Sequence, residues 1–205
     1  MKPVDELIPR IAARALSAPE PVIYDAIIHA AQRFCERTRI WREEDSFQTG
    51  DSGFEYACAP YGAIIHEIES AYFDGVKLKE TSISWLDDQI PTWRDRNLSN
   101  PRYITQTEPN TVRLVPAGIG TVKLNLILKP GNDAEELPDF LIDNYRRAII
   151  DGALGEVLSI PKQEFSDPQL AIYYMQRFES KLDQLATQGI QGQQRAPVRS
   201  KPSFF

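Results

Sequence analysis

The stretch Leu137-Pro138-Asp139-Phe140-Leu141 decides the fold, because it opens the first of two late helices. This helix is expected to continue through Leu154, and Asp167-Pro168 opens the second. Apolar residues recur in the second helix at steps of three and four, which is typical of a helix with one buried face. They are Ala171, Tyr174, Phe178, Leu182 and Leu185.

The N-terminal part of the chain predicts the helices that cover this pair. Pro3 to Leu16 is expected to form a short helix that Pro9 interrupts, and Pro19 suits the first position of a longer helix. The longer helix is expected to end near Ile40-Trp41. Its apolar face comprises Ile23, Ile27, Ala30, Ala31, Phe34 and Thr38. We expect the helices at the two ends of the chain to pack on each other, because each apolar stripe must be buried.

The middle of the chain predicts strands. Asp74-Gly75 is the strongest signal for a two-residue hairpin turn, and Thr121 to Leu128 alternates as a half-buried strand does. Strands are also expected at Arg102–Thr105 and Thr111–Val115, and a short helix with a loop between Thr81 and Arg96. The sequence therefore predicts an α+β fold. A small helical bundle from the N- and C-terminal helices would carry an inserted antiparallel, meander-like β domain and an extended C-terminal arm.

Four segments follow from this interpretation. Residues 1–45 are the N-terminal helices of the bundle, 46–132 the β-rich insert, 133–187 the C-terminal helices and 188–205 a flexible arm. The arm begins with a Gln- and Gly-rich linker and has no apolar period. Its candidate binding residues are three cations and two terminal aromatic side chains: Arg195, Arg199, Lys201, Phe204 and Phe205.

The charge is uneven along the chain. The net charge is −6, and the residues after Asp183 carry three positive charges and no negative one, so the rest carries −9. An acidic body argues against tight, sequence-independent binding of DNA by the whole surface. We expect no signal peptide, since Met1 to Glu6 has no apolar run, and no segment that spans a membrane.

Residues with catalytic or metal-binding potential are few and poorly spaced. His29 and His66 are the only histidines, and Cys35 and Cys58 the only cysteines. Cys35 falls on the apolar helix face, where cysteine behaves as a small hydrophobic residue. Neither pair has the spacing of a zinc site. We therefore expect no catalytic, cofactor-binding or metal site and no enzyme activity, with an enzyme of unrecognised site as the remaining alternative.

The order of several short motifs resembles the head–tail connector (adaptor, head-completion) proteins of tailed bacteriophages. The resemblance covers nearly the whole chain up to Leu185. The motifs are Pro19-Glu20-Pro21, Ala30-Ala31 with Phe34-Cys35, Thr38 and Trp41, then Asp74-Gly75, Val112 to Pro116, Leu137-Pro138-Asp139, Gly152-Ala153-Leu154, and Asp167-Pro168 with Ala171, Tyr174 and Phe178.

The resemblance implies a structural virion protein. It implies a homododecameric ring beneath the portal protein that lengthens the DNA channel, serves DNA packaging and ejection, and holds tail or nozzle proteins. The arm would bind the portal, and DNA would pass without specific binding, which an acidic lumen favours. The protein would be made in the cytoplasm of the bacterial host and would reside in the virion neck, at the head–tail junction. A non-viral or prophage-derived adaptor is the alternative.

Overall fold

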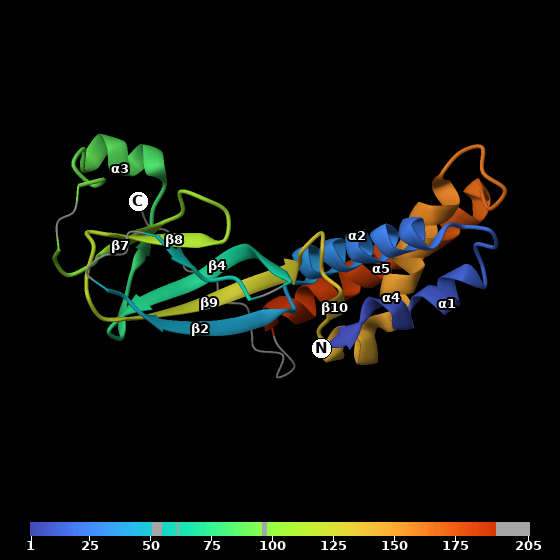
Figure 1. Cartoon of the computed structure of the whole chain (residues 1–205), viewed down its shortest axis with the longest axis horizontal. Helices are drawn as coiled ribbons and strands as arrows, with labels where there is room; N and C mark the ends of the chain where they lie inside the picture. The colour runs from blue at the N-terminus through green and yellow to red at the C-terminus, as the bar shows by residue number, and fades with distance from the viewer. Residues whose placement is uncertain (51–54, 61, 96–97, 192–205) are drawn as a thin grey trace. The chain divides into compact units, whose positions relative to one another are not determined.

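The computed structural model describes the whole chain except residues 51–54, 61, 96–97 and 192–205, and it leaves the side chains of 187–191 undescribed. Two compact units divide the chain (Figure 1). Met1–Ile40 and Lys129–Phe205 form the helical unit, and Trp41–Leu128 forms the β unit. The two ends of the chain thus share one unit. The predicted segment limits at residues 45 and 132 stay predictions.

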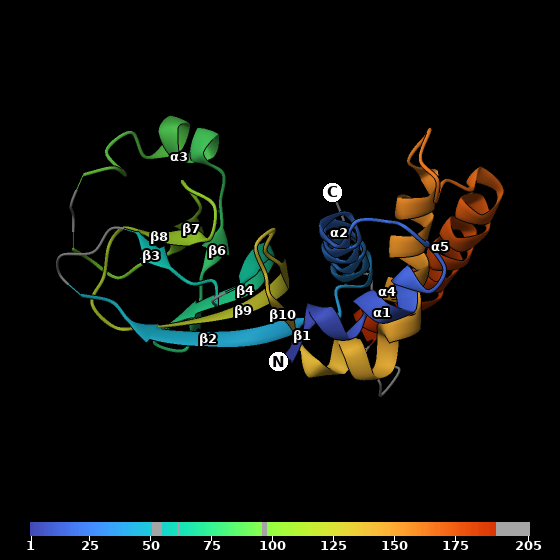
Figure 2. The same cartoon turned by 45° about the vertical axis from the view of Figure 1, so that its right-hand side comes forward.

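Three long helices make the core of the helical unit. Each packs against the other two, as Figure 2 shows. Phe34 and Phe178 are fully buried, and the Phe34 ring lies 5.0 Å, centroid to centroid, from the ring of Tyr145. The prediction that the two ends of the chain pack on each other is confirmed. The helices are α2 (Glu20–Thr38), α4 (Asp139–Ser159) and α5 (Pro168–Gln191).

Two glycines let α4 approach its neighbours closely. A Cβ atom at Gly152 would lie 2.9 Å from Cβ of Ala30 and 3.1 Å from the Phe178 ring, and one at Gly155 would lie 3.2 Å from the backbone nitrogen of Met175. A side chain at either position would push the helices apart. The apolar residues of α4 around these glycines, such as Leu154, are fully buried, and α4 contacts α1 (Ile8–Ala12), α2 and α5, so it is the central helix of the unit.

The N-terminal segment is shorter in helix than the sequence predicts. Lys2–Pro3 forms strand β1, Val4–Glu6 a 3₁₀ turn η1, and only Ile8–Ala12 the helix α1. Strand β1 pairs antiparallel with β10 (Glu136–Leu137), and the Val4 amide donates to the carbonyl of Glu135 at 3.0 Å. The prediction of one helix from Pro3 to Leu16 was wrong at its start, because residues far along the chain pair with the backbone there.

The β unit contains two four-stranded sheets, with strand orders β2-β9-β4-β5 and β3-β8-β7-β6. The meander prediction was wrong, because β2 pairs with β9 and not with the strand that follows it. One pair, β6 with β7, is parallel, so the insert is not purely antiparallel. The elements are β2 (Arg42–Gln48), β3 (Tyr56–Ala57), β4 (Ala63–Phe73), β5 (Val76–Lys77), β6 (Lys79–Glu80), α3 (Ile83–Gln89), β7 (Tyr103–Thr105), β8 (Thr111–Val115) and β9 (Thr121–Pro130).

The hairpin between β4 and β5 has the predicted two-residue turn. Asp74 and Gly75 have φ angles of 46° and 80°, as a turn with two left-handed residues requires. The Asp74 carboxylate accepts a hydrogen bond from the Thr121 amide at 2.8 Å, which links the turn to β9. The alternation predicted for β9 is also confirmed, since Val122 and Leu124 are fully buried while Lys123 is exposed.

Candidate functional site

The predicted arm residues Arg195, Arg199, Lys201, Phe204 and Phe205 lie outside the described residues. Helix α5 extends to Gln191, past residue 188, where the arm was predicted to begin. The candidate site that sequence reasoning placed in the arm is therefore still a prediction, and the described surfaces have to be searched for others.

The two cysteine side chains are buried. Cys35 is fully buried in α2, and burial raises the pKa of its thiol far above the ordinary value. Burial, followed by the nearby Asp45 carboxylate, raises the pKa of Cys58 to about 11. Both thiols stay protonated at neutral pH, and a protonated thiol is a poor nucleophile. The prediction that Cys35 packs as a small hydrophobic residue is confirmed.

Both histidines are solvent-exposed. Nδ1 of His29 lies 2.9 Å from a carboxylate oxygen of Glu156 on α4, although the sequence placed it beside Asp25. His66 is exposed on β4. Among the described residues, no group of three His, Cys, Asp or Glu side chains could hold a metal ion. In that same part of the chain, no helix has the length and apolar character needed to cross a membrane.

A groove lined by arginine is the most distinctive polar feature of the helical unit. Arg10 comes from α1, Arg14 from the turn that follows it, Arg146 and Arg147 from α4, and Arg177 from α5, around a hollow of about 530 Å³. We call these five residues, together with Asp151, the arginine groove. With five guanidinium groups against one carboxylate, its formal net charge is +4. That concentration of positive charge is unusual in a chain of net charge −6.

Asp151 organises the floor of the groove. Only 7% of this residue is exposed, and its carboxylate lies 2.9 Å from Nη2 of Arg177. Burial raises the pKa of Asp151, and the positive charges of Arg177, Arg147 and Arg14 oppose that shift. One carboxylate thus pairs with Arg177 of α5 and also feels the charges of Arg147 on α4 and of Arg14 in the turn after α1.

The other arginines of the groove have no carboxylate of their own. Arg10, Arg14 and Arg147 are exposed and Arg146 is half-buried. Within the described part of the chain, none of these four forms an ion pair. Their guanidinium groups remain available for carboxylates or phosphates, which they can bind through paired hydrogen bonds.

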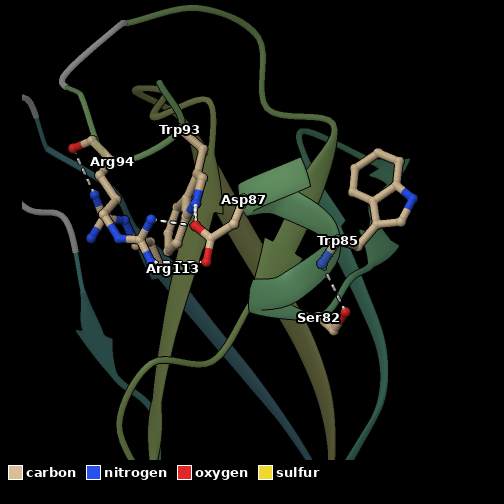
Figure 3. A network of polar contacts seen from close by, with 6 residues as sticks. All are labelled: Ser82, Trp85, Asp87, Trp93, Arg94 and Arg113. Carbon is tan, nitrogen blue, oxygen red and sulfur yellow. Dashed lines mark hydrogen bonds and ion pairs between the residues drawn. The ribbon is translucent and has the colours of Figure 1, made fainter. Parts of the chain in front are cut away.

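The β unit carries a second polar cluster, around the helix α3 (Figure 3). The Trp93 indole donates from Nε1 to Asp87 at 2.7 Å, and Arg94 forms an ion pair with the same carboxylate. The guanidinium carbons of Arg94 and Arg113 lie 4.3 Å and 4.9 Å from the Trp93 ring centre. Arg113 also donates to the backbone carbonyl of Arg94 at 3.0 Å. These contacts pin the segment after α3 against the sheet.

The ion pair between Asp87 and Arg94 shifts the pKa values of both groups. Hydrogen bonds from Arg94, and then from Trp93, hold the pKa of Asp87 below its ordinary value. The same Asp87 contact raises the pKa of Arg94. Under the polar contacts, Leu86, Trp93 and Val115 form a small apolar core. The cluster therefore has a structural role: it holds α3 against the sheet.

Two of the three tryptophans are buried in the core. Trp41 is 3% and Trp93 5% exposed. Trp85 is half-buried, with its ring 5.1 Å from that of Tyr103 and the Lys79 ammonium 5.4 Å from its ring centre. Tyr173 on α5 is 51% exposed, which confirms that it faces away from the stripe of Tyr174 and Phe178.

Sequence reasoning missed the arginine groove. Two signals were present: Arg10 and Arg14 stand four residues apart in the segment predicted as a short helix, and Arg147 and Asp151 stand four residues apart in α4. Neither signal shows that the two helices meet, because α1 and α4 are separated by more than a hundred residues and join only through packing.

A comparison with known protein families gives one match. The family model described as SU10 adaptor protein matches residues 2–201, which is nearly the whole chain. No curated protein matches the chain.

Proposed function

This chain belongs to the SU10 adaptor protein family, a family of bacteriophage adaptors, and from that membership we propose a role at the head–tail junction. Copies of the chain would form a ring beneath the portal protein, join the capsid vertex to the tail and extend the channel through which DNA passes. The observation that carries this proposal is the family match over residues 2–201.

The division into two units supports a joining role. The helical unit has its own core around Phe34 and Phe178, and the β unit has buried strands such as β9. Each unit can therefore keep its fold while its surface meets a different partner. We propose the portal, the tail or nozzle proteins and neighbouring copies as those partners, with a dodecamer as the ring.

The charge of the chain suits a channel protein. Without the basic arm the chain carries −9, and a ring would repeat that charge around the lumen. DNA phosphates would be repelled by such a wall, so DNA would slide through it and would not be held. The residues that line the lumen would then be mainly acidic.

The arm is our proposed portal contact. Arg195, Arg199 and Lys201 would meet acidic or carbonyl-rich surface, and Phe204 and Phe205 would fill an apolar pocket. Buried aromatic residues often dominate such interfaces, with about 2 kcal/mol or more from each. Many arms around one ring would add their contributions, so that weak single contacts give firm attachment.

The family suggests a structural protein without enzymatic activity. The protonated thiols of Cys35 and Cys58 are in keeping with that role. A prophage-derived or non-viral adaptor would use the same surfaces, and the presence or absence of a cognate portal separates these possibilities.

The test is a reconstitution with the portal protein of the same phage. The chain alone should sediment as a monomer or a weak oligomer at micromolar concentration. With portal added, the two should sediment together, and electron microscopy should show an additional ring at one end of the portal. If the chain and the portal stay separate at every salt concentration tried, the proposed function is wrong. A stable large ring without portal would refute only assembly on the portal.

A further inference from the structure

The helical unit carries a second charged surface, opposite in sign to the arginine groove. Four exposed carboxylates gather around Tyr24: Asp5, Asp25, Asp133 and Glu135. We call these four residues the acidic edge. They belong to η1, α2 and the segment before β10, whereas the groove is built from α1, the turn that follows it, α4 and α5. The two surfaces share no residue.

Hydrogen bonds hold the three segments of the acidic edge together. The Tyr24 hydroxyl donates to the carbonyl of Ala134 at 2.8 Å, which brings α2, with Asp25 next to Tyr24 in sequence, to the segment that carries Asp133 and Glu135. The Val4 amide donates to the carbonyl of Glu135 at 3.0 Å, which brings Asp5 to the same place. The carboxylates are close enough to add to the effect of burial in raising the pKa of Tyr24.

These carboxylates lack the cations that their neighbours have. Asp139 lies 3.0 Å from the N-terminal ammonium group, and Asp143 pairs with Lys2. In the described part of the chain, the four residues of the acidic edge form no ion pair. Four like charges in one place repel each other, so positive charge from outside the chain would stabilise them.

We propose that the arginine groove of one copy binds the acidic edge of the next copy, head to tail, around the ring. This inference rests on the proposed function, since it names the contact between copies in that ring. Each copy offers both surfaces, and a contact between unlike surfaces closes into a ring when its rotation fits. The formal charges match, because the groove carries +4 and the edge carries four carboxylates.

A second copy fits the groove better than DNA does. Asp151 sits at the floor of the groove, where a phosphate chain would meet its carboxylate. Single carboxylates on short side chains can instead pair one by one with Arg10, Arg14 and Arg146 around the rim, each through a two-pronged contact. Such a contact fixes the register between copies and weakens with salt.

The test reverses each surface separately. Groove reversal is Arg10→Glu/Arg14→Glu/Arg146→Glu, which leaves Arg147 and Arg177 beside Asp151. Edge reversal is Asp25→Arg/Asp133→Arg/Glu135→Arg, on exposed side chains. The control, Arg102→Glu/Lys162→Glu, reverses two exposed cations outside both surfaces. Circular dichroism and melting show whether each variant folds. Should a reversed variant misfold, the milder Arg10→Gln/Arg14→Gln/Arg146→Gln replaces the groove variant, and loss of rings is then its readout.

Closed rings on the portal, counted by electron microscopy, are the main readout. Each reversed variant alone should bind portal but lose closed rings, while the control keeps them. An equal mixture of the two reversed variants should regain closed rings, because each groove then meets an edge of opposite charge. One chain with all six changes should regain them too.

Other results separate this inference from the proposed function. Normal rings from either reversed variant would overturn the inference and leave the adaptor role intact. Loss of portal binding by the groove variant, with no rescue in the mixture, would place the portal or DNA in the groove and also overturn it. If the wild type itself forms no ring on portal, the proposed function fails. The inference is then tested without portal, by sedimentation of the two reversed variants. It holds if they associate when mixed while each alone stays monomeric, and it is overturned if the mixture stays monomeric.

Discussion

Replacement of Phe178 by alanine tests the packing that holds the helical unit together. The side chain is fully buried in α5, and its ring lies 3.1 Å from the position that a Cβ atom at Gly152 would take. The Arg33 guanidinium covers the ring at 5.5 Å from its centre. Removal of the ring leaves a cavity between α4 and α5, because neighbouring contacts keep the helices in place. A Phe→Ala change of this kind costs about 3–5 kcal/mol, a large share of the 5–15 kcal/mol that is typical of a domain.

Two optical probes follow the two units separately in urea. All three tryptophans lie in the β unit, so tryptophan fluorescence reports that unit, while far-ultraviolet circular dichroism reports mainly α2, α4 and α5. With a slope of about 1–3 kcal/mol per molar urea, the circular dichroism midpoint of Phe178→Ala should fall by roughly 1–5 M. The fluorescence midpoint should move less, because the ring contributes nothing to the core of the β unit.

The control is Tyr173→Ala on the same helix. Tyr173 is 51% exposed, so its loss should change stability by about 0.5 kcal/mol or less. If Phe178→Ala and Tyr173→Ala shift the circular dichroism midpoint equally, the assigned buried face of α5 is wrong. If the fluorescence midpoint falls as far as the circular dichroism midpoint, the two units unfold as one and their independence is refuted.

Further predictions concern a contact of α4, the titration of Asp87 and the C-terminal arm. Gly152→Val should destabilise the helical unit by about 1–3 kcal/mol in the same urea assay, because its side chain would collide with Ala30, whereas Gly50→Ala, with open space around it, should be neutral. Asp87, whose pKa is lowered in the folded state, should stabilise the β unit above about pH 4 and lose that effect as the pH falls through its folded pKa. The fluorescence midpoint of Asp87→Asn should therefore change less than that of the wild type between about pH 5 and pH 2. Deletion of residues 192–205 should leave the melting temperature unchanged and abolish sedimentation with portal. Phe204→Ala/Phe205→Ala should weaken portal binding with less dependence on salt than Arg195→Ala/Arg199→Ala does. Full binding by the deleted chain would show that the helical unit makes the joint.

The long helices and the main hairpin could be predicted because their signals are local. The apolar spacing that ends in Leu185 and the turn Asp74-Gly75 act over a few residues, and the structure has both. The buried residues Phe34 and Phe178 were predicted for the same reason, since helical periodicity alone selects the face that packs.

The missed features depend on contacts between distant residues. Strand β1 is two residues long and pairs with Glu136–Leu137, which is distant in the sequence, so no local pattern predicts it. The parallel pairing of Lys79–Glu80 with Tyr103 and Ile104 likewise has no signal in either segment. The arginine groove was missed because it exists only once α1, α4 and α5 are packed.

The central claim is that copies of this chain form a ring on the portal. Native mass measurement of the purified complex tests it most directly, because the mass counts the copies on each portal. The account predicts one discrete mass, equal to the portal plus twelve copies of the chain, and no large species for the chain alone. A spread of small, variable copy numbers, or a mass equal to the portal by itself, would contradict it.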